Sequence, residues 1–349
     1  MMTTPYEIQT ILADRSREKT EGLAQEAQRL TEQYFGGTIA LYAPLYLSNY
    51  CTSHCTYCGF HSHNRIQRFK LTEDQMHQEM SHVAKTGIRN ILMLTGESYT
   101  LTPLSYLKTA VGVAKQHFTT ISLEVHPMTT EEYQELFLDG VDGVTIYQET
   151  YDRTRYQQVH LAGLKSNYDN RYEAPQRAAK AGIRQISMGI LLGLADAALD
   201  LYSLYRHLRS MEKNYPGVEY SLSFPRLRPI KGEDFLSPSI DDLTFIKIIC
   251  LTRILFPRVG INLSTRENAK LRDRLLGVGV TRISAGSNTS VGGYTIKPPE
   301  EQDPQFDIED TRSVAEIVRI LKERNLDPVF TDWRPIGNEI ASKHKGGML

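Results

Sequence analysis

Three cysteines lie within eight residues, as Cys51, Cys55 and Cys58 in the pattern C-x-x-x-C-x-x-C. Three thiolates can bind three irons of a cubane iron–sulfur cluster, which leaves the fourth iron without a protein ligand. Thiolate is the soft ligand that such iron prefers, and the open iron is where a cofactor or substrate binds and one-electron chemistry begins. The pattern therefore predicts a 4Fe–4S cluster with one open coordination position.

The spacing alone permits other sites. A structural zinc ion takes four protein ligands, and three nearby histidines could supply the fourth: His54, His61 and His63. A disulfide between Cys51 and Cys55 would leave Cys58 unpaired. The only other cysteine, Cys250, lies in an apolar segment and is interpreted as a core residue.

Composition and charge set wide limits on function. The 349-residue chain is 40% hydrophobic, and 40 Lys and Arg against 41 Asp and Glu give a net charge of -1. Because there is no basic surplus, no nucleic-acid partner is expected. No apolar run reaches the length of a membrane span, and the N-terminal segment has no apolar signal core. With few cysteines as well, we expect a cytoplasmic protein with no membrane partner.

Eight short runs of β-branched and apolar residues alternate with helix-like segments, at residues 38–46, 89–95, 120–126, 142–148, 184–191, 218–225, 259–265 and 280–285. This alternation indicates an α/β fold with a parallel sheet. An open doubly wound sheet would show the same rhythm, but the number of strands favours a (β/α)₈ TIM-type barrel. We assign residues 37–335 to the barrel, 1–36 to an N-terminal helical extension and 336–349 to a C-terminal tail.

Local signals support these boundaries. Four predicted helices end in a glycine that is followed at once by Ile or Val: Gly87, Gly140, Gly182 and Gly279. Glycine suits the left-handed residue that closes a helix. Thr72 and Gln75 have the spacing of a capping box, which predicts a helix start after the cysteine loop.

A barrel places its reactive groups at the C-terminal ends of the strands. Charged or small residues follow almost every predicted strand: Gly96 and Glu97, Glu124, Gln148 and Glu149, Gly189 to Gly193, Arg226 and Arg228, Ser264 to Glu267, and Ser284 to Ser287. We therefore predict one site at this rim, beside the cysteine loop.

The stretch LYLSNYCTSHCTYCGFHSHN resembles the radical S-adenosylmethionine enzymes, and more narrowly their aromatic amino-acid lyases, above all the tyrosine lyases. LTGES, LEVHP, IYQETY, SFPRLRP, NLSTRE and VGGY recur in order at the corresponding strand ends. The resemblance covers about residues 20 to 335. It implies a radical S-adenosylmethionine (β/α)₈ barrel whose open iron binds the amino and carboxylate groups of S-adenosylmethionine.

The resemblance also implies roles around this cofactor. Glu97 would accept hydrogen bonds from the methionyl ammonium, with Gly96 allowing close approach; the alternative is that Glu97 lies at a helix N-terminus for electrostatic reasons. Gln148 and Glu149 would contact the ribose hydroxyls. Glu124 would share that site or pair with an arginine of the barrel mouth. Gly189 and Gly193 would leave room for the adenine, or serve packing alone.

The substrate side is expected to centre on Arg266, because an amino-acid carboxylate is best bound by a planar, bidentate guanidinium. Ser264 would add a hydroxyl contact, and Tyr57 would contact the substrate amino group while shielding the iron. Ser284 and Ser287 would complete the pocket. Arg226 and Arg228 would either position the substrate or pair with Glu124 and Glu149.

The family's reaction cleaves the Cα–Cβ bond of L-tyrosine to p-cresol and 2-iminoacetate (dehydroglycine), the imine used in thiamine thiazole biosynthesis. The resemblance implies a reductant such as flavodoxin or ferredoxin, and thiazole synthase as receiver of the imine. Because the imine hydrolyses in water, the long loop 286–310, with Gly292, Gly293 and Tyr294, is a candidate lid.

Three alternatives remain at this level. One is a hydrogenase-maturation type of tyrosine lyase, which ISAGSNTSVGGY resembles, although no cysteine follows Cys250 to bind a second cluster. Another is a lyase of tryptophan or another amino acid, since selectivity depends on pocket shape. The third is a zinc-binding scaffold without catalysis.

Overall fold

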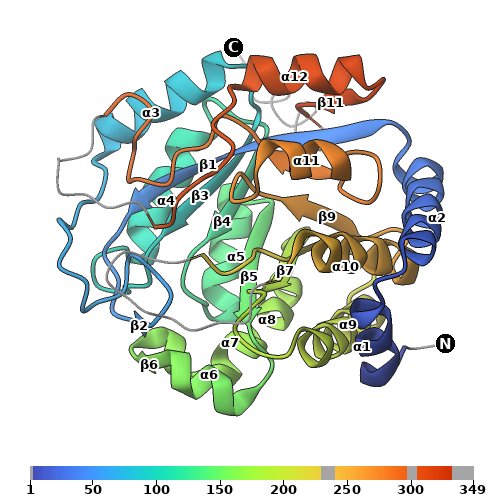
Figure 1. The fold of residues 1–349 in the computed structure, drawn as a ribbon. Helices are drawn as coiled ribbons and strands as arrows, with labels where there is room; N and C mark the ends of the chain where they lie inside the picture. Colours follow the sequence, from blue (N-terminus) through green and yellow to red (C-terminus); the bar gives the residue numbers. More distant parts are fainter. Residues whose placement is uncertain (1–2, 229–239, 297–304, 332–349) are drawn as a thin grey trace.

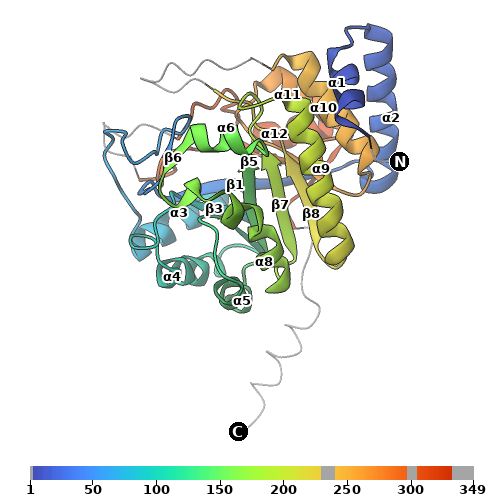
Figure 2. The same cartoon turned by 90° about the horizontal axis from the view of Figure 1, so that it is seen from below.

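The computed structural model describes residues 3–228, 240–296 and 305–331. A barrel of parallel strands forms its centre, with helices on the outer surface (Figures 1 and 2). The barrel strands are β1 (Thr38–Ser48), β3 (Asn90–Thr95), β4 (Thr120–Glu124), β5 (Gly143–Glu149), β7 (Gln185–Ile190), β8 (Glu219–Ser223), β9 (Gly260–Leu263) and β10 (Arg282–Ser284). β10 pairs with both β9 and β1, so the sheet closes on itself. Closure confirms the predicted barrel and excludes the open doubly wound sheet.

All eight strands lie where the sequence pattern predicts them, with differences of a few residues at their ends. Their composition follows from burial on both faces, since helices cover the outside and side chains fill the inside. Every residue of β7 is buried, for example. A further short strand, β11 (Asp327–Val329), pairs with the first residues of β1.

The helices are α1 (Pro5–Ala13), α2 (Arg17–Phe35), α3 (Glu73–Lys85), α4 (Leu104–Ala114), α5 (Thr130–Asp139), α6 (Arg153–Val159), α7 (Tyr168–Tyr172), α8 (Ala174–Lys180), α9 (Ala197–Asn214), α10 (Asp242–Leu255), α11 (Ala269–Leu275) and α12 (Val314–Glu323), with a 3₁₀ turn η1 (Leu164–Ser166). The capping box of Thr72 and Gln75 starts α3 as predicted. Among the described residues, no helix is long and apolar enough to span a bilayer.

The predicted helical extension is present as α1 and α2, which pack on the barrel helices α9 and α10. Buried Lys247 of α10 donates to backbone carbonyls at the end of α1, including that of Asp14. Cys250 is fully buried in the same helix, as expected of a core residue. The end of the predicted barrel domain and the tail 336–349 lie outside the described residues.

Three of the four predicted helix-closing glycines have a left-handed backbone. Gly87, Gly140 and Gly182 have φ angles of 97°, 112° and 98°. The prediction for Gly279 was wrong, because after α11 the left-handed residue is Gly277, with φ 80°. Gly279 is small for a different reason, since a Cβ there would lie 2.8 Å from a methyl carbon of Ile249.

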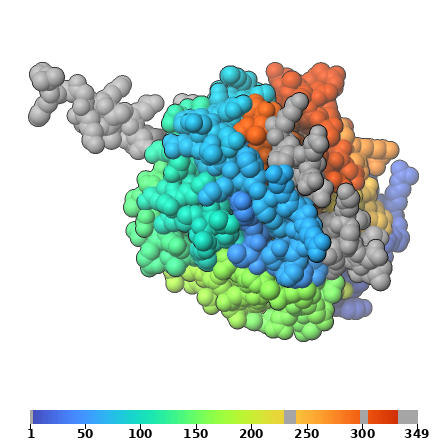
Figure 3. Space-filling model, turned by 90° about the vertical axis from the view of Figure 1, so that its left-hand side faces the viewer, coloured from blue at the N-terminus to red at the C-terminus, as the bar shows by residue number. Residues whose placement is uncertain are grey.

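The connection from β5 to β7 contains more than one helix. Its strand β6 (His160–Ala162) pairs antiparallel with β2 (His54–Cys55) of the cysteine loop. The two segments lie close together at Gly163, where a Cβ would come within 2.2 Å of the Thr52 carbonyl oxygen. In the space-filling view, the blue segment after β1 lies against the green segment of α6 and β6 (Figure 3). The sequence pattern did not predict this pairing.

The first part of the predicted lid is attached to the barrel. Val291 forms a parallel bridge with Tyr46 of β1. Glu79 of α3, which is fully buried, accepts hydrogen bonds from the backbone N–H groups of residues 294, 295 and 296 at 2.7 to 2.9 Å. Residues 291–296 are therefore held against β1 and α3, while 297–304 lie outside the described residues.

Candidate active site

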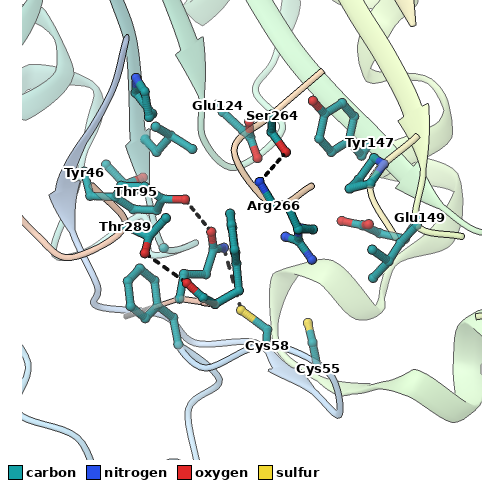
Figure 4. Close-up of a pocket in the computed structure, with 18 of the residues that line it drawn as sticks. Tyr46, Cys55, Cys58, Thr95, Glu124, Tyr147, Glu149, Ser264, Arg266 and Thr289 are labelled. Carbon is teal, nitrogen blue, oxygen red and sulfur yellow. Dashed lines mark hydrogen bonds between the residues drawn. The ribbon is translucent and has the colours of Figure 1, made fainter. Parts of the chain in front are cut away.

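A cavity opens at the C-terminal ends of the barrel strands (Figure 4). One side of it is lined by Cys51, Cys55 and Cys58. The space inside it and at its open mouth is about 1370 Å³. The residues that line it come from the ends of several strands and from the cysteine loop, so the cavity joins the predicted cluster site to the barrel rim.

The cysteines fit a cluster better than the alternatives. All are free thiols, so Cys51 and Cys55 form no disulfide. Among the described residues, only one set of three His, Cys, Asp or Glu ligand atoms lies within 4.8 Å of one another, and it comprises His54, His61 and His63. The three sulfurs are therefore spread more widely than one zinc ion with bonds of about 2.3 Å allows. A cluster, which binds each thiolate to a different iron, permits this spread.

Burial makes these thiols poor acids until a metal binds. It raises the pKa of Cys51 to about 11 and that of Cys55 well above its usual value. Metal ligation requires the thiolate, so cluster binding displaces the protons.

Gly96 brings the end of β3 against the cysteine loop. A Cβ at this position would lie 2.3 Å from the carbonyl oxygen of Tyr50 and 3.0 Å from the Cβ of Cys51. The next residue continues the contact, since the Glu97 carbonyl accepts a hydrogen bond from the N–H of Thr52 at 2.8 Å. Gly96 thus lacks a side chain because the cysteine loop packs against its backbone. From the sequence, we expected a different reason, the close approach of S-adenosylmethionine.

Glu97 lies in the cavity with one carboxylate oxygen bound and one without a partner. Its Oε1 accepts a hydrogen bond from the buried guanidinium of Arg171 at 2.6 Å. Its Oε2 is buried and has no hydrogen-bond partner. A buried carboxylate oxygen without a donor is costly, so it is suited to accept a hydrogen bond from a bound ammonium group.

Glu149 forms the second buried ion pair of this side, with Lys165 at 2.5 Å. It ends β5 with a φ angle of 69°, a left-handed conformation that is uncommon outside glycine. Such strain is typically retained at functional positions, where the surrounding structure holds it. Both Glu149 and Lys165 line the cavity.

Tyr57 lines the cavity, but its hydroxyl is already engaged. It lies 2.7 Å from Nε2 of His160, whose Nδ1 lies 2.8 Å from the carbonyl oxygen of Tyr156. The carbonyl can only accept, so Nδ1 carries the proton and the Tyr57 hydroxyl donates to Nε2. Burial lowers the pKa of His160 to about 2, which keeps the ring neutral. Tyr57 thus offers its ring to the cavity, and its hydroxyl is not free for a substrate amino group.

Glu124 faces the cavity from the end of β4, between the aromatic rings of the barrel interior (Figure 4). Burial, reinforced by the nearby charge of Glu149, raises the pKa of its carboxyl to about 7. It forms no ion pair with a cation of the described residues. The protonated and ionised forms of Glu124 are therefore both accessible near neutral pH.

Arg266 points into the same cavity from the loop after β9 (Figure 4). Its guanidinium lies over the ring of Phe306, 3.7 Å from the ring centroid, and one nitrogen lies 3.3 Å from the carbonyl oxygen of Arg226. Nε is buried without a hydrogen-bond partner, and no carboxylate of the described residues forms an ion pair with it. Burial lowers its pKa. This geometry leaves the guanidinium available for an anionic ligand.

The two other rim arginines have partners that the sequence did not indicate. Arg226 forms ion pairs with Glu267 and Asp242. Arg228 lies 2.6 Å from Glu309 and 3.5 Å from Glu267. Neither pairs with Glu124 or Glu149, so that alternative was wrong. Arg228 still lines the cavity, whereas Arg226 supports the loop that carries Arg266.

The remaining predicted residues divide into two groups. Ser264 and Ser284 line the cavity. Four residues do not line it: Gln148, Gly189, Gly193 and Ser287. Gln148 lies between Tyr147 and Glu149, which both face the cavity, so strand alternation turns its side chain away. A Cβ at Gly189 would come within 2.4 Å of the Ser223 carbonyl oxygen, which favours the packing role.

Two family models match the chain, the radical SAM superfamily over residues 45–204 and the Biotin and Thiamin Synthesis associated domain over residues 223–327. The 2-iminoacetate synthase of Salmonella typhimurium is 38% identical over 94% of this chain and 86% of its own. That of Escherichia coli is 38% identical over 95% of this chain and 87% of its own. The chain belongs to the 2-iminoacetate synthase family of radical S-adenosylmethionine enzymes.

The fold agrees with this family. The FeFe-hydrogenase maturase HydG from Carboxydothermus hydrogenoformans superposes with a TM-score of 0.87 at 33% identity, over 95% of this chain and 77% of that one. Membership makes the chain a carbon–carbon lyase whose cofactors are a 4Fe–4S cluster and S-adenosylmethionine. The spacing of the cysteines and the free oxygen of Glu97 fit these groups.

Sequence reasoning missed several residues that line the cavity: Tyr46, Tyr147, Lys165, Arg171, Gln305 and Phe306. Lys165 and Arg171 come from the connection between β5 and β7, beyond the residues that directly follow a strand. The length of that connection was a usable signal, because 149 to 185 is longer than one crossover helix requires. Gln305 and Phe306 return from the loop after β10, and no sequence signal places them.

Proposed function

We propose that this enzyme cleaves the Cα–Cβ bond of L-tyrosine to p-cresol and 2-iminoacetate, and that the imine enters thiamine thiazole biosynthesis. The proposal is supported by the two relatives at 38% identity, which are both 2-iminoacetate synthases. The observation that carries it is Arg266, a half-buried arginine whose Nε is buried and whose guanidinium has no ionic partner among the described residues, in the same cavity as the three cysteines. An amino-acid carboxylate is the ligand that such a group prefers.

The cofactors supply the radical chemistry. A bound cluster, once reduced by a reductant such as flavodoxin or ferredoxin, would supply the electron for reductive cleavage of S-adenosylmethionine, and so the radical chemistry that acts on the substrate. The protein residues bind and orient. Cys51, Cys55 and Cys58 would hold the cluster, and the free Oε2 of Glu97 would accept a hydrogen bond from the methionyl ammonium.

Cations beside Glu97 are suited to the methionyl carboxylate. Arg171 and Lys165 are buried on this side of the cavity, each with one carboxylate partner. Further N–H groups of these side chains can donate to a bound carboxylate while the ion pairs persist. Glu149 would then hold Lys165 in position with one oxygen and contact a ribose hydroxyl with the other.

Substrate binding would use the opposite side. Arg266 would bind the tyrosine carboxylate, with the Ser264 hydroxyl beside it at 3.3 Å from the Arg266 backbone N–H. The aromatic ring would extend toward Tyr147 and Glu124, which line the interior part of the cavity. With a pKa of about 7, the Glu124 carboxyl can donate to or accept from a phenolic hydroxyl. This group favours tyrosine over an apolar aromatic side chain.

The loop after β10 contributes Thr289 to the cavity lining and is held in place at residues 294–296, so it would limit the access of water to the imine. Transfer of the imine to thiazole synthase is part of the proposal.

An anaerobic assay with the reconstituted enzyme, dithionite and S-adenosylmethionine tests the function. Each aromatic amino acid is supplied in turn, and products are identified by mass spectrometry. We expect p-cresol and 2-iminoacetate from tyrosine. Skatole or related indoles from tryptophan, with no p-cresol from tyrosine, would assign the enzyme to tryptophan instead. Stoichiometric zinc without iron in protein prepared anaerobically would reject both lyase functions.

A further inference from the structure

Gln305 connects the cluster loop to a tyrosine of the barrel wall. Its side-chain Nε2 lies 3.8 Å from Sγ of Cys58, within hydrogen-bond range for sulfur. Its Oε1 lies 2.6 Å from the hydroxyl of Tyr46. Figure 4 shows dashed lines near Tyr46 and at the Cys58 sulfur for these two contacts.

The Cys58 thiolate decides which end of the amide faces the sulfur, because a thiolate can only accept a hydrogen bond, and the Tyr46 hydroxyl fits the orientation that results. Tyr46 is 3% exposed, and burial raises its pKa well above the usual value. The hydroxyl therefore keeps its proton and can donate to the amide oxygen. With Oε1 engaged in this way, the NH₂ group of Gln305 is directed at Cys58. The hydrogen bond from Tyr46 to Gln305 therefore orients the hydrogen bond from Gln305 to Cys58.

The backbone holds Gln305 in place from both sides. Its carbonyl oxygen accepts from the N–H of Gly59 at 3.2 Å, directly after Cys58. Its own N–H donates to the carbonyl of Thr289 at 3.2 Å, and the Thr289 hydroxyl donates to the carbonyl of Phe306 at 2.9 Å. The amide donor is thus delivered by a segment that is anchored to the cluster loop and to the loop after β10.

We propose that Gln305 is a positioning residue that sets the reduction potential of the cluster by donating a hydrogen bond to the Cys58 thiolate. An N–H donor withdraws electron density from a ligating sulfur and stabilises the more negative, reduced cluster. The donor therefore raises the potential and makes the cluster easier to reduce. The inference rests on the three-cysteine cluster of the family and is independent of which amino acid the enzyme cleaves.

The same segment also contacts the substrate side. Phe306, the next residue, lies under the guanidinium of Arg266. The two functions of the segment can be separated by substitution, because the side chain of Gln305 faces the sulfur and that of Phe306 faces the arginine. A change at Gln305 alone is expected to alter the cluster and to leave the Michaelis constant for the amino acid unchanged.

The test is an anaerobic redox titration of the reconstituted holoenzyme in the absence of S-adenosylmethionine. Electron paramagnetic resonance measures the fraction of reduced cluster at each potential. Gln305→Leu removes the donor, and Gln305→Glu replaces it with an acceptor of the same shape. We expect Gln305→Leu to disfavour reduction about tenfold, equivalent to a shift of about 59 mV to more negative potential. Gln305→Glu should shift further in the same direction, because it adds negative charge.

Two further variants keep the result unambiguous. Gln185→Leu removes a buried glutamine at the start of β7, at the end of the barrel opposite to the cavity. This variant should leave the reduction potential of the cluster unchanged. Tyr46→Phe removes only the hydroxyl that orients the amide, and should produce a smaller negative shift.

An unchanged potential in Gln305→Leu, with four irons per chain, would overturn the proposal. If the Gln305 variants do not bind a cluster, Tyr46→Phe decides, and an unchanged potential there would overturn it. Absence of p-cresol in wild-type enzyme that shows the expected shifts would reject the proposed substrate but leave this inference intact.

Discussion

The cofactor side and the substrate side of the cavity treat charge differently. On the cofactor side, Glu97 pairs with Arg171 and Glu149 with Lys165, so the buried charges are compensated before any ligand binds. On the substrate side, Arg266 lies over an aromatic ring and has no carboxylate partner among the described residues. The cofactor side offers one free oxygen within a balanced network, whereas the substrate side keeps a whole charge for its ligand.

This difference determines how much each ligand stabilises the protein when it binds. A buried, unpaired charge is costly, and a complementary ligand removes that cost. The substrate carboxylate would therefore stabilise its side of the cavity more than S-adenosylmethionine stabilises the other. The comparison can be tested with variants that change one side of the cavity. For each variant, both the binding of S-adenosylmethionine and the kinetics with tyrosine are measured.

The largest effect is expected from Cys55→Ala, which removes one of three cluster ligands. Formation of 5′-deoxyadenosine should fall to background, because no electron can reach the cofactor without the cluster. Iron content and the absorbance near 400 nm report cluster loss independently of turnover. Cys250→Ala is the matched control, since that residue is buried in α10 away from the cavity. Normal 5′-deoxyadenosine formation by Cys55→Ala would refute the assignment of this ligand.

Glu97→Gln tests the cofactor side. It removes the charge that pairs with Arg171 and the acceptor proposed for the methionyl ammonium. Loss of a hydrogen bond to a charged group costs about 1.5–3 kcal/mol, so the Kd for S-adenosylmethionine should rise roughly tenfold to a hundredfold. Equilibrium binding to the cluster-loaded enzyme measures this. The Michaelis constant for tyrosine should stay the same. If that constant changed while the Kd for S-adenosylmethionine did not, Glu97 would belong to the substrate side.

Arg266→Lys tests the substrate side with the charge retained. An ammonium cannot reproduce the two parallel hydrogen bonds of a guanidinium, and loss of one is worth about 1.4 kcal/mol or tenfold in binding. We expect the Michaelis constant for tyrosine to rise by about that factor, with cluster content and the Kd for S-adenosylmethionine unchanged. Steady-state kinetics with both ligands provide the check. Unaltered tyrosine kinetics would remove Arg266 from the substrate site.

Glu124→Gln should have the smallest effect on turnover and is best seen in stability against pH. The folded protein keeps the Glu124 proton up to about pH 7, whereas the unfolded chain releases it near the usual value of 4.5. The unfolded state therefore binds fewer protons in this window, so wild-type stability falls as pH rises through it. At 1.36 kcal/mol per pKa unit, the penalty reaches at most roughly 3 kcal/mol above pH 7.

The glutamine variant lacks this penalty. Its thermal unfolding temperature, measured anaerobically on the holoenzyme, should exceed that of wild type more at pH 8 than at pH 5. A gap that is constant across this range would show that Glu124 titrates normally. That result would weaken its proposed contact with a phenolic hydroxyl.

Most of the barrel and the cluster could be predicted from the sequence, because each depends on local patterns. The strands follow from short apolar runs, and the residues in the loops after them, such as Glu97 and Arg266, reach the cavity by the geometry of the barrel. The prediction placed both Gln148 and Glu149 at the rim, whereas the pairing of β5 with β7 shifts register between Tyr147 and Glu149 and leaves Gln148 as the extra residue that does not line the cavity. A sequence window does not fix such a register shift.

The residues that contact Glu97 and Cys58 were harder to predict, because they do not directly follow a barrel strand. Arg171 lies in a short helix of the β5–β7 connection, and Gln305 returns after a long loop. Their positions depend on tertiary contacts such as the one at Gly163, which exist only after the cysteine loop has folded. Ion pairing within a site is likewise invisible in a sequence, as the partners of Arg226 illustrate.

The short pairing of β2 with β6 joins iron handling to cofactor recognition. Cys55 is opposite His160, and the Ser53 hydroxyl accepts a hydrogen bond from the backbone N–H of Lys165. The segment that carries Cys55 is therefore bonded to the segment that carries Lys165, the lysine proposed for the methionyl carboxylate. Damage to the metal centre by oxygen would loosen both at once, and repair would have to rebuild them together.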